Sequence, residues 1–478
     1  MKHLSTTDNN RGKTLHSLGC TDETAGEVYA DLSAIANTTV QDLCAKNPAL
    51  LVFPHCLGKH GDDIGKLKTF ELSSSLDQPQ NATLTTGNLM GFIGCEKAQV
   101  SITSRFTESS ESSLHKQKSE DFFLHYMLEK VGLVNSFDLL HSFTKANIFD
   151  ILLFLFPAML RKAMSQGLFT TYRNFKRNDA NLKGTVDVSR HIHHNVPFGG
   201  RVAYNSRERT FDNAVTELIR HTIEAIKLKT LGKHLLITNP DTKRDVEKII
   251  QATPSYNYFA RDKIIAQNTK PKIQPFFSNY RALQKLCLAI LHHQKIAYRQ
   301  NSNEVYGVLF DGAWLWEEYL AKVLSPCGFK HPQNRVGSGG ILVWNGNPRY
   351  PDFYTGKQIR GFRLSETIPQ ENFVLDAKYK RFDTSIARDD VHQLIAYMHI
   401  LPANRAGLIY PSEQTALDAD IAVQHKSYRL YGLGGKLESF GFSIPKLVES
   451  NQDSASPYLE FTKRMLKMEK LLIQQLDM

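Results

Sequence analysis

The sequence predicts an α+β protein of several domains, with a β-rich module near the N-terminus, a mainly helical central region and a C-terminal α/β core. The chain has 478 residues, more than one hydrophobic core usually organises. Hydrophobic residues make up 41% of it and charged residues 22%, as in folded, soluble proteins. Along the chain, the apolar spacing changes between the two-residue period of strands and the 3.6-residue period of helices.

The first 48 residues predict a polar and then helical extension, and residues 49–118 predict the β-rich module and a linker. Helical spacing covers Asp22–Ala45. Short apolar runs between turn residues predict strands; they lie at Ala49–Phe53, within Leu84–Gly94 and at Ala98–Ser104. The Ser- and Glu-rich tract Thr107–Ser119 predicts an exposed linker.

Residues 119–300 predict the central, mainly helical domain. The helices are expected at Asp121–Val134, Phe143–Ser165, Thr210–Lys229, 243–252 and 276–298, with strand-like segments at Leu168–Tyr172 and Leu182–Asp187. The most apolar stretch, Ile148–Leu160, contains Asp150 and Pro157. It is shorter than the roughly 20 residues that span a bilayer, so we expect a buried helix and no membrane partner.

Residues 301–445 predict an α/β core with the order helix, three strands, helix, strand (αβββαβ), and residues 446–478 predict a C-terminal helix. Asn345-Gly346 between two strand-like runs is typical of a hairpin. The elements are expected at Glu304–Leu324 (helix), Ile341–Trp344, Arg349–Tyr354 and Asn372–Lys378 (strands), Asp389–Ile400 (helix) and Ala406–Tyr410 (strand).

Two carboxylates and a lysine in this core predict phosphodiester hydrolysis. Asp352 follows Tyr350-Pro351 after the hairpin, and Asp376-Ala377-Lys378 ends the next apolar strand. Side chains two residues apart on a strand share a face, so Asp376 and Lys378 point the same way. Mg²⁺ prefers oxygen ligands and activates water for hydrolysis. We expect Asp352, Asp376 and the Ala377 carbonyl to bind Mg²⁺, or Mn²⁺ in its place, and Lys378 to polarise the attacking water.

Three further residues are candidates for this site. Glu317, on the preceding helix, is expected to supply another carboxylate to the metal. Lys380 shares the strand face of Lys378 and is the alternative ammonium if the register differs. Gln393 lies on the following helix, on one face with Tyr397.

This arrangement resembles the PD-(D/E)xK nuclease superfamily and, within it, the McrC family, the nuclease subunits of methylcytosine-dependent and LlaJI-type restriction systems. Leu315–Leu320 resembles the family's helix with the first acidic residue, which places that residue at Glu317. Tyr350–Phe353 and Leu375–Lys380 resemble its metal motifs. A weaker resemblance covers Thr86–Ile93, Leu182–Asp187 and Thr210–Val215, and the first 80 residues are not clearly covered. The resemblance implies a PD-(D/E)xK fold for the C-terminal core.

The resemblance also implies a partner. McrC-like proteins work with an AAA+ hexamer that hydrolyses GTP or ATP, translocates DNA and carries the recognition domain, and their N-terminal and central parts dock on it. This sequence has no G-x-x-x-x-G-K-[ST] loop, because Gly65-Lys66 and Gly435-Lys436 lack the upstream glycine and the following Ser or Thr. We therefore expect this chain to bind no nucleotide.

The charge of the chain favours a nucleic-acid partner. The net charge is +10, and basic residues gain affinity for double-stranded DNA by releasing counterions. Basic residues interleaved with aromatic ones concentrate between Arg161 and Thr210, among them Arg173, Lys176, Arg177 and Lys183. This segment predicts a surface that faces DNA or the AAA+ partner, and a solvated basic face is an equal alternative.

Cysteine usage favours a cytoplasmic protein. The six cysteines are scattered, with no C-x-x-C pair, which argues against a disulfide framework and a zinc site. Met1–Cys20 is polar, unlike a signal peptide.

The residues and the resemblance together predict a metal-dependent DNA endonuclease subunit of a modification-dependent or LlaJI-type restriction system, acting in anti-phage defence. Two alternatives stay open. One is a non-catalytic subunit that docks on and stimulates an AAA+ motor. The other is a stand-alone structure-specific or repair nuclease.

Overall fold

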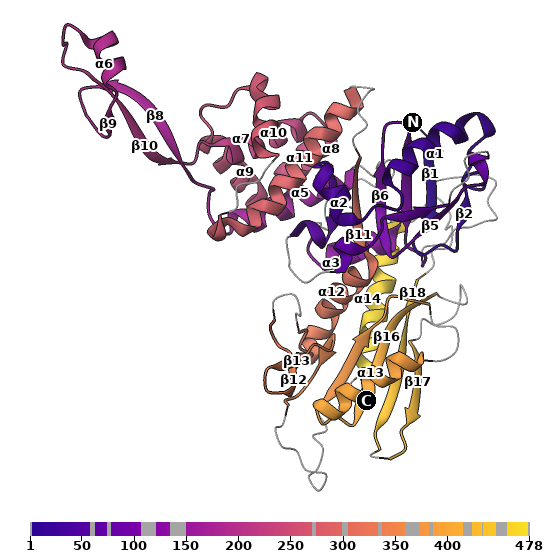
Figure 1. The fold of residues 1–478 in the computed structure, drawn as a ribbon. Coiled ribbons are helices and arrows are strands. Elements are labelled where there is room, and N and C mark those ends of the chain that lie inside the picture. Colours follow the sequence, from indigo (N-terminus) through magenta and orange to yellow (C-terminus); the bar gives the residue numbers. More distant parts are fainter. Residues whose placement is uncertain are drawn as a thin grey trace. The chain divides into compact units, whose positions relative to one another are not determined.

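The computed structural model divides the chain into two units (Figure 1). The larger unit comprises Met1–Ile151 and Arg299–Met478, and the central unit comprises Leu152–Tyr298. The structure describes residues 2–57, 63–73, 78–106, 121–133, 150–269, 274–298, 305–332, 337–358, 372–381, 386–413, 423–432, 434–445 and 457–476. The expected linker Thr107–Ser119 lies outside the described residues.

The N-terminal module, residues 2–133, is built on a mixed five-stranded sheet. Its main elements are β1 (Lys2–Thr7), β2 (Lys13–Thr14), α1 (Asp22–Ile35), α2 (Val40–Lys46), β3 (Leu50–Phe53), β4 (Phe70–Leu72), β5 (Thr83–Thr86), β6 (Leu89–Gly94), β7 (Ala98–Thr103) and α3 (Phe122–Lys130). The sheet order is β1-β7-β6-β11-β3, and β2, β5 and β4 form a separate small sheet. The apolar faces of α1 and α2 pack on this core through Val28, Leu32 and Leu43.

Strand β11 (Tyr306–Asp311) joins this sheet from far along the chain, antiparallel to β6 and parallel to β3. Gly91 and Gly307 allow the close approach of β6 and β11. A Cβ on Gly91 would collide with the Val308 carbonyl, and one on Gly307 with the Phe92 carbonyl. Both glycines have positive φ angles, 127° and 156°, which side chains disfavour.

Two expectations for these segments are corrected. Residues 2–46 contribute a strand and two helices to the N-terminal core, so they are not a separate polar extension. The expected helix Glu304–Leu324 is strand β11 followed by helix α12 (Gly312–Leu324) within its described part. An apolar run does not by itself distinguish a buried strand from a helix, and the strands that pair with β11 lie more than 200 positions earlier in the printed sequence.

The C-terminal core contains a second mixed five-stranded sheet, in the order β14-β15-β16-β18-β17. Its elements are β14 (Phe353–Tyr354), β15 (Phe373–Ala377), α13 (Arg388–Ile400), β16 (Arg405–Glu413), β17 (Gln424–Arg429), β18 (Lys436–Ile444) and α14 (Pro457–Leu476). β15, β16 and β18 are parallel neighbours, whereas β14 and β17 are antiparallel edges. Helix α13 packs on β15 and β16 through Leu394 and Met398.

The strand count of the predicted αβββαβ order needs one correction. The hairpin β12 (Ile341–Trp344) and β13 (Asn347–Arg349) forms a two-stranded sheet of its own. The predicted strand Arg349–Tyr354 is divided between β13 and β14. Pro351 lies at the division and has no N–H for a continuous ladder.

Helices α3, α12 and α14 connect the N-terminal module to the C-terminal core. Trp316 of α12 lies 6.2 Å from the ring of Phe123 and 5.8 Å from that of Phe442. The Glu469 carboxylate of α14 accepts hydrogen bonds from Tyr126 (2.7 Å) and Tyr319 (3.0 Å). These buried contacts make the two regions one folding unit.

The central unit consists of helices and one projecting ribbon (Figure 1). Its helices are α5 (Asp150–Met164, of which Leu152 onward is in this unit), α7 (Ala214–Lys227), α8 (Thr230–Ile237), α9 (Pro240–Ala252), α10 (Arg261–Asn268) and α11 (Ser278–Tyr298). The ribbon comprises β8 (Thr171–Asp179), β9 (Thr185–Val186), α6 (Val188–Asn195) and β10 (Val202–Thr210), with sheet order β8-β10-β9. Of the helices the structure describes, none combines the length and apolar character that crossing a membrane requires.

Candidate active site

Asp352 and Asp376 meet because β14 and β15 are antiparallel neighbours. Asp352 directly precedes β14, and Phe353 pairs with Leu375. The Asp352 carboxylate accepts a hydrogen bond of 2.7 Å from the backbone N–H of Ala377. His331 fixes the other side of this turn through its ring nitrogen, 2.8 Å from the Asp352 carbonyl oxygen. The structure thus brings together the two acidic residues that the sequence singled out.

Lys378 directly follows β15, and its ammonium group points toward Asp376. Its Nζ lies 2.7 Å from Asp376 Oδ2 and donates to Gln393 Oε1 at 3.3 Å. Gln393 is held in turn by its own contact with the Tyr397 hydroxyl, 3.2 Å away. Helix α13 therefore helps to position the lysine through Gln393.

Lys380 takes a different direction. Its ammonium pairs with the carboxylate of Asp390 on α13, whereas Lys378 is 3.8 Å from the same carboxylate and closer to Asp376. Of the two lysines that the sequence left open, Lys378 forms an ion pair with Asp376 and Lys380 forms one with Asp390.

Burial and neighbouring carboxylates disfavour the negative charge of the acidic pair. Burial raises the pKa of Asp352 well above its ordinary value, and Asp376 and Glu317 raise it further. Burial also raises the pKa of Asp376, although Lys378 acts in the opposite direction. Burial alone would lower the pKa of Lys378, but Asp376, Asp352 and Asp390 together raise it. The Lys378 ammonium thus interacts with three carboxylates. A bound cation would reduce the repulsion that remains between Asp352 and Asp376.

Ala377 and Lys378, next to the acidic pair in the sequence, line a cleft of 420 Å³ that also includes residues of the N-terminal module. Glu317, on α12, lies in its wall with Lys378 and Lys380. Asn9, Asn88 and Arg105 complete the wall from the opposite end of the chain. Sequence reasoning missed these three residues. The only local signal was the run Asp8-Asn9-Asn10, which is typical of a turn and places Asn9 at φ 46°.

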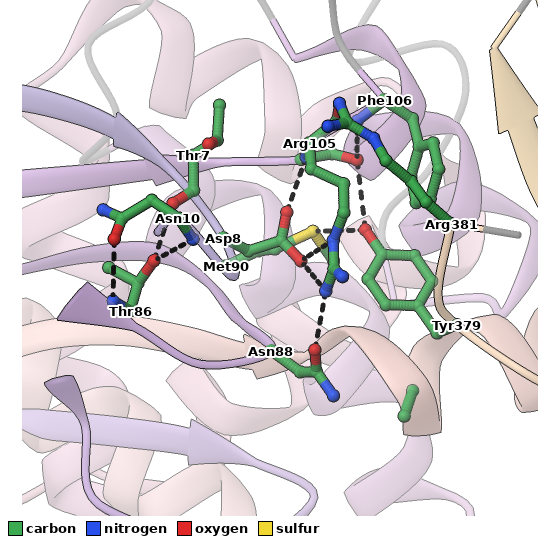
Figure 2. A network of polar contacts seen from close by, with 12 residues as sticks. Thr7, Asp8, Asn10, Thr86, Asn88, Met90, Arg105, Phe106, Tyr379 and Arg381 are labelled. Atoms are coloured by element: carbon green, nitrogen blue, oxygen red, sulfur yellow. Dashed lines mark hydrogen bonds and ion pairs between the residues drawn. The ribbon is translucent and has the colours of Figure 1, made fainter. Parts of the chain in front are cut away.

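A buried ion pair anchors this part of the wall (Figure 2). Arg105 Nη2 lies 2.6 Å from Asp8 Oδ2, and the two side chains are 6% and 0% exposed. Burial raises the pKa of Asp8 to about 6, although Arg105 lowers it. The Arg105 guanidinium also stacks 4.9 Å from the Tyr379 ring, and its backbone carbonyl accepts a hydrogen bond of 2.7 Å from Arg381. The N-terminal module thereby holds the segment that follows Lys378.

The donor atoms suit a hard divalent cation. Among the described residues, no group of three or more His, Cys, Asp or Glu side chains is arranged to hold a metal by itself. Mg²⁺ nevertheless commonly binds through one or two carboxylates and retains several waters. Asp376, which is buried, and Asp352, which is partly buried, provide two carboxylates, and the raised pKa of each means that its negative charge is unfavourable in these surroundings. The residues present therefore fit Mg²⁺ with water and substrate oxygens as further ligands.

The basic residues predicted to face DNA lie in the ribbon of the central unit. Arg173, Lys176 and Arg177 are on β8, and Lys183 precedes β9. Arg177 pairs with Glu208 of β10 at 2.8 Å. Exposed apolar residues lie among them on the same ribbon, at Tyr172, Leu182, Val186, Val188, Ile192, Val196 and Phe198. The surface is thus mixed basic and apolar.

Comparisons with known proteins identify the family. No curated protein matches the chain. One similar solved structure is a half-complex from a tetradecameric assembly of Thermococcus gammatolerans McrB AAA+ hexamers with bound McrC. It is 14% identical, with 98% of this chain and 99% of that chain covered and a TM-score of 0.48. Another is the Thermococcus gammatolerans McrBC complex, 13% identical, with 68% and 87% covered and a TM-score of 0.35.

The family model described as "McrBC 5-methylcytosine restriction system component" matches residues 84–411. The match covers more than half of the chain and includes Glu317, Asp352, Asp376 and Lys378. The chain therefore belongs to the family of McrBC 5-methylcytosine restriction system components.

Proposed function

We propose that this chain is the metal-dependent DNA endonuclease subunit of its restriction system. The observation that carries the proposal is the carboxylate pair of the partly buried Asp352 and the buried Asp376, with the Lys378 ammonium 2.7 Å from Asp376. Two adjacent carboxyl groups with raised pKa values, beside a lysine that lines a cleft, are typical of a functional site. We further propose that the sheet carrying it is a PD-(D/E)xK core.

In this proposal the chain holds Mg²⁺, or Mn²⁺, through Asp352, Asp376 and the Ala377 carbonyl, with Glu317 as a further carboxylate. The bound ion would activate water and neutralise charge on the phosphate. Lys378 orients the attacking water and donates to a phosphate oxygen as negative charge develops there. Gln393 keeps the ammonium in place, because its Oε1 accepts from Lys378.

The chain is proposed to act on double-stranded DNA together with an AAA+ GTPase or ATPase hexamer. The mixed ribbon of the central unit supports a docking role, because exposed apolar residues rimmed by charges are typical of protein interfaces. Modification-dependent restriction would then combine cutting by this chain with recognition and NTP hydrolysis by the partner. A DNA contact through Arg173, Lys176, Arg177 and Lys183 is the alternative use of this surface.

The decisive experiment compares four single variants in a cleavage assay with duplex DNA, the AAA+ partner, NTP and Mg²⁺. We expect Asp376→Asn and Lys378→Met to lower the cleavage rate by at least about a hundredfold, the loss typical of a removed catalytic group. Lys380→Met should stay within about tenfold of wild type, since Lys380 pairs with Asp390. Asp389→Asn, an exposed neighbour on α13, is the matched control and should cut normally.

Wild-type rates in the Asp376→Asn protein would contradict the proposal. A wild-type complex that hydrolyses NTP but never cuts DNA with Mg²⁺ or Mn²⁺ would instead support the purely docking role. Cleavage by the chain alone, independent of NTP, would support a stand-alone nuclease.

A further inference from the structure

Asn88 is a polar residue of the N-terminal module whose position is fixed at the wall of the cleft. It directly precedes β6, and its backbone carbonyl accepts a hydrogen bond of 2.8 Å from the N–H of Gly312. Gly312 is the first residue of α12, the helix that carries Glu317. The backbone of Asn88 is therefore tied to an element of the candidate active site.

The side chain of Asn88 is oriented by Arg105. Arg105 Nη2 donates to Asn88 Oδ1 at 2.6 Å and to Asp8 Oδ2 at 2.6 Å. A guanidinium has only donors, so the amide oxygen of Asn88 must face Arg105. The amide nitrogen is then turned away from Arg105, as Figure 2 shows. Among the described residues it has no hydrogen-bond partner, although Asn88 lines the cleft with Glu317 and Lys378.

The cleft around this amide suits a phosphate group. Lys378, Lys380 and Arg105 bring three positive charges to its lining against the one carboxylate of Glu317. Asn9 is another neutral polar residue in its wall. The volume of 420 Å³ lies within the range of roughly 300–1,000 Å³ that small-molecule pockets span. Asparagine amides are also among the groups that commonly contact DNA phosphates.

We propose that the Asn88 amide donates a hydrogen bond to a phosphate oxygen of the DNA strand held in the cleft. The N-terminal module then supplies a substrate-binding residue, and the Asp8–Arg105 pair is the positioning element that presents its donor end. The inference rests on the proposed nuclease function, because it takes DNA as the substrate of this cleft.

Three versions of residue 88 distinguish phosphate binding from a structural role. Asn88→Asp keeps an oxygen for Arg105 but places negative charge where the donor was, and Asn88→Ala removes both groups. Phosphate binding predicts the affinity order Asn, then Ala, then Asp. A role limited to holding Arg105 predicts that Asp resembles Asn and that Ala is the defective variant.

The test measures binding of the full chain to a fluorescent DNA duplex by anisotropy, in EDTA and at low salt, because phosphate contacts weaken with salt. We expect about tenfold weaker binding for Asn88→Ala and about a further tenfold loss for Asn88→Asp, each equivalent to one hydrogen bond or one repulsive contact. Asn81→Asp, an exposed residue of the same module, adds the same charge elsewhere and should bind within about twofold of wild type.

Asn88→Asp binding as tightly as wild type would overturn the inference, and so would a wild-type chain that binds no DNA under these conditions. If either variant fails to fold, judged by its melting curve, Asn88→Ser and Asn88→Glu take their places with the same expected order. Because binding is read without cleavage, a failed Asn88 test leaves the Asp376 test standing. The reverse also holds.

Discussion

Asp352 is a partly buried residue whose surroundings oppose the ionisation of its carboxyl group. Its pKa is raised first by burial and then by Asp376 and Glu317. The folded protein therefore binds this proton more tightly than the unfolded chain does. Stability linked to such a group is full below the unfolded pKa and is lost as the pH rises through the folded pKa.

Asp352→Asn is therefore expected to raise the melting temperature of the metal-free protein while abolishing cleavage. The amide oxygen of the new side chain can still accept the hydrogen bond from the Ala377 N–H. The substitution also removes the free-energy cost of a poorly solvated charge. We expect a gain of at least about 2 °C near pH 8, equivalent to about 1 kcal/mol, that shrinks toward pH 5. Thermal unfolding in EDTA across this pH range measures it.

Mg²⁺ provides the control for this stability prediction. It should raise the melting temperature of wild type, by mass action, and leave Asp352→Asn nearly unchanged. A variant that is less stable than wild type at pH 8 in EDTA would show that the carboxylate is well compensated without a metal.

At the scale of elements, the ribbon β8–β10 with α6 differs from the rest of the central unit. Both faces of β8 are largely exposed, and although Ala203 and Tyr204 of β10 are buried, many apolar side chains of the ribbon are not. Ile192 on α6 is 58% exposed and Phe198 is 67% exposed. These residues would gain burial by binding a partner.

The double variant Ile192→Ser, Phe198→Ser is expected to weaken binding to the AAA+ partner at least about tenfold, as loss of two interface side chains typically does. Its melting temperature should change little, because both residues are exposed. Analytical size exclusion or biolayer interferometry with the purified partner measures the affinity.

Phe259→Ser is the matched control for the ribbon variant. Phe259 is 91% exposed in the same unit but lies outside the ribbon, so its replacement should leave partner binding unchanged. Equal binding by the ribbon variant and wild type would place the docking surface elsewhere.

At the scale of the whole molecule, the N-terminal module and the C-terminal core depend on each other. Strand β11 lies between β6 and β3, and Trp316 packs on Phe123. Tyr379, the residue after Lys378, has its hydroxyl 3.1 Å from that of Ser104. The candidate site is thus built on both ends of the chain.

A fragment of residues 305–476 is therefore expected not to fold by itself. It would expose both edges of β11 and the face of Trp316, and loss of a single large buried aromatic contact already costs roughly 3–5 kcal/mol. Coexpression with residues 1–133 should restore a soluble complex with a cooperative melting transition. Cooperative unfolding of the lone fragment near the full-length melting temperature would contradict this interdependence.

The sequence by itself predicted most of the C-terminal elements from α12 to β16 in their order, and it singled out the acidic residues Asp352 and Asp376, which the structure places next to each other. Local signals sufficed, because Asn345-Gly346 specifies a hairpin and the apolar run ending at Asp376 specifies a strand. The family assignment rests on the same motifs and is confirmed by the match over residues 84–411.

Only the tertiary structure decided that β11 is a strand, that the hairpin β12-β13 stays out of the sheet, and which lysine contacts the acidic pair. It also decided that Asn88 and Arg105 belong to the cleft. Each of these outcomes depends on partners distant in sequence. β11 pairs with β3 and β6, and Lys380 is drawn to Asp390 rather than to Asp376. Spacing along the chain records side-chain period and turn chemistry, but not which distant surfaces will meet.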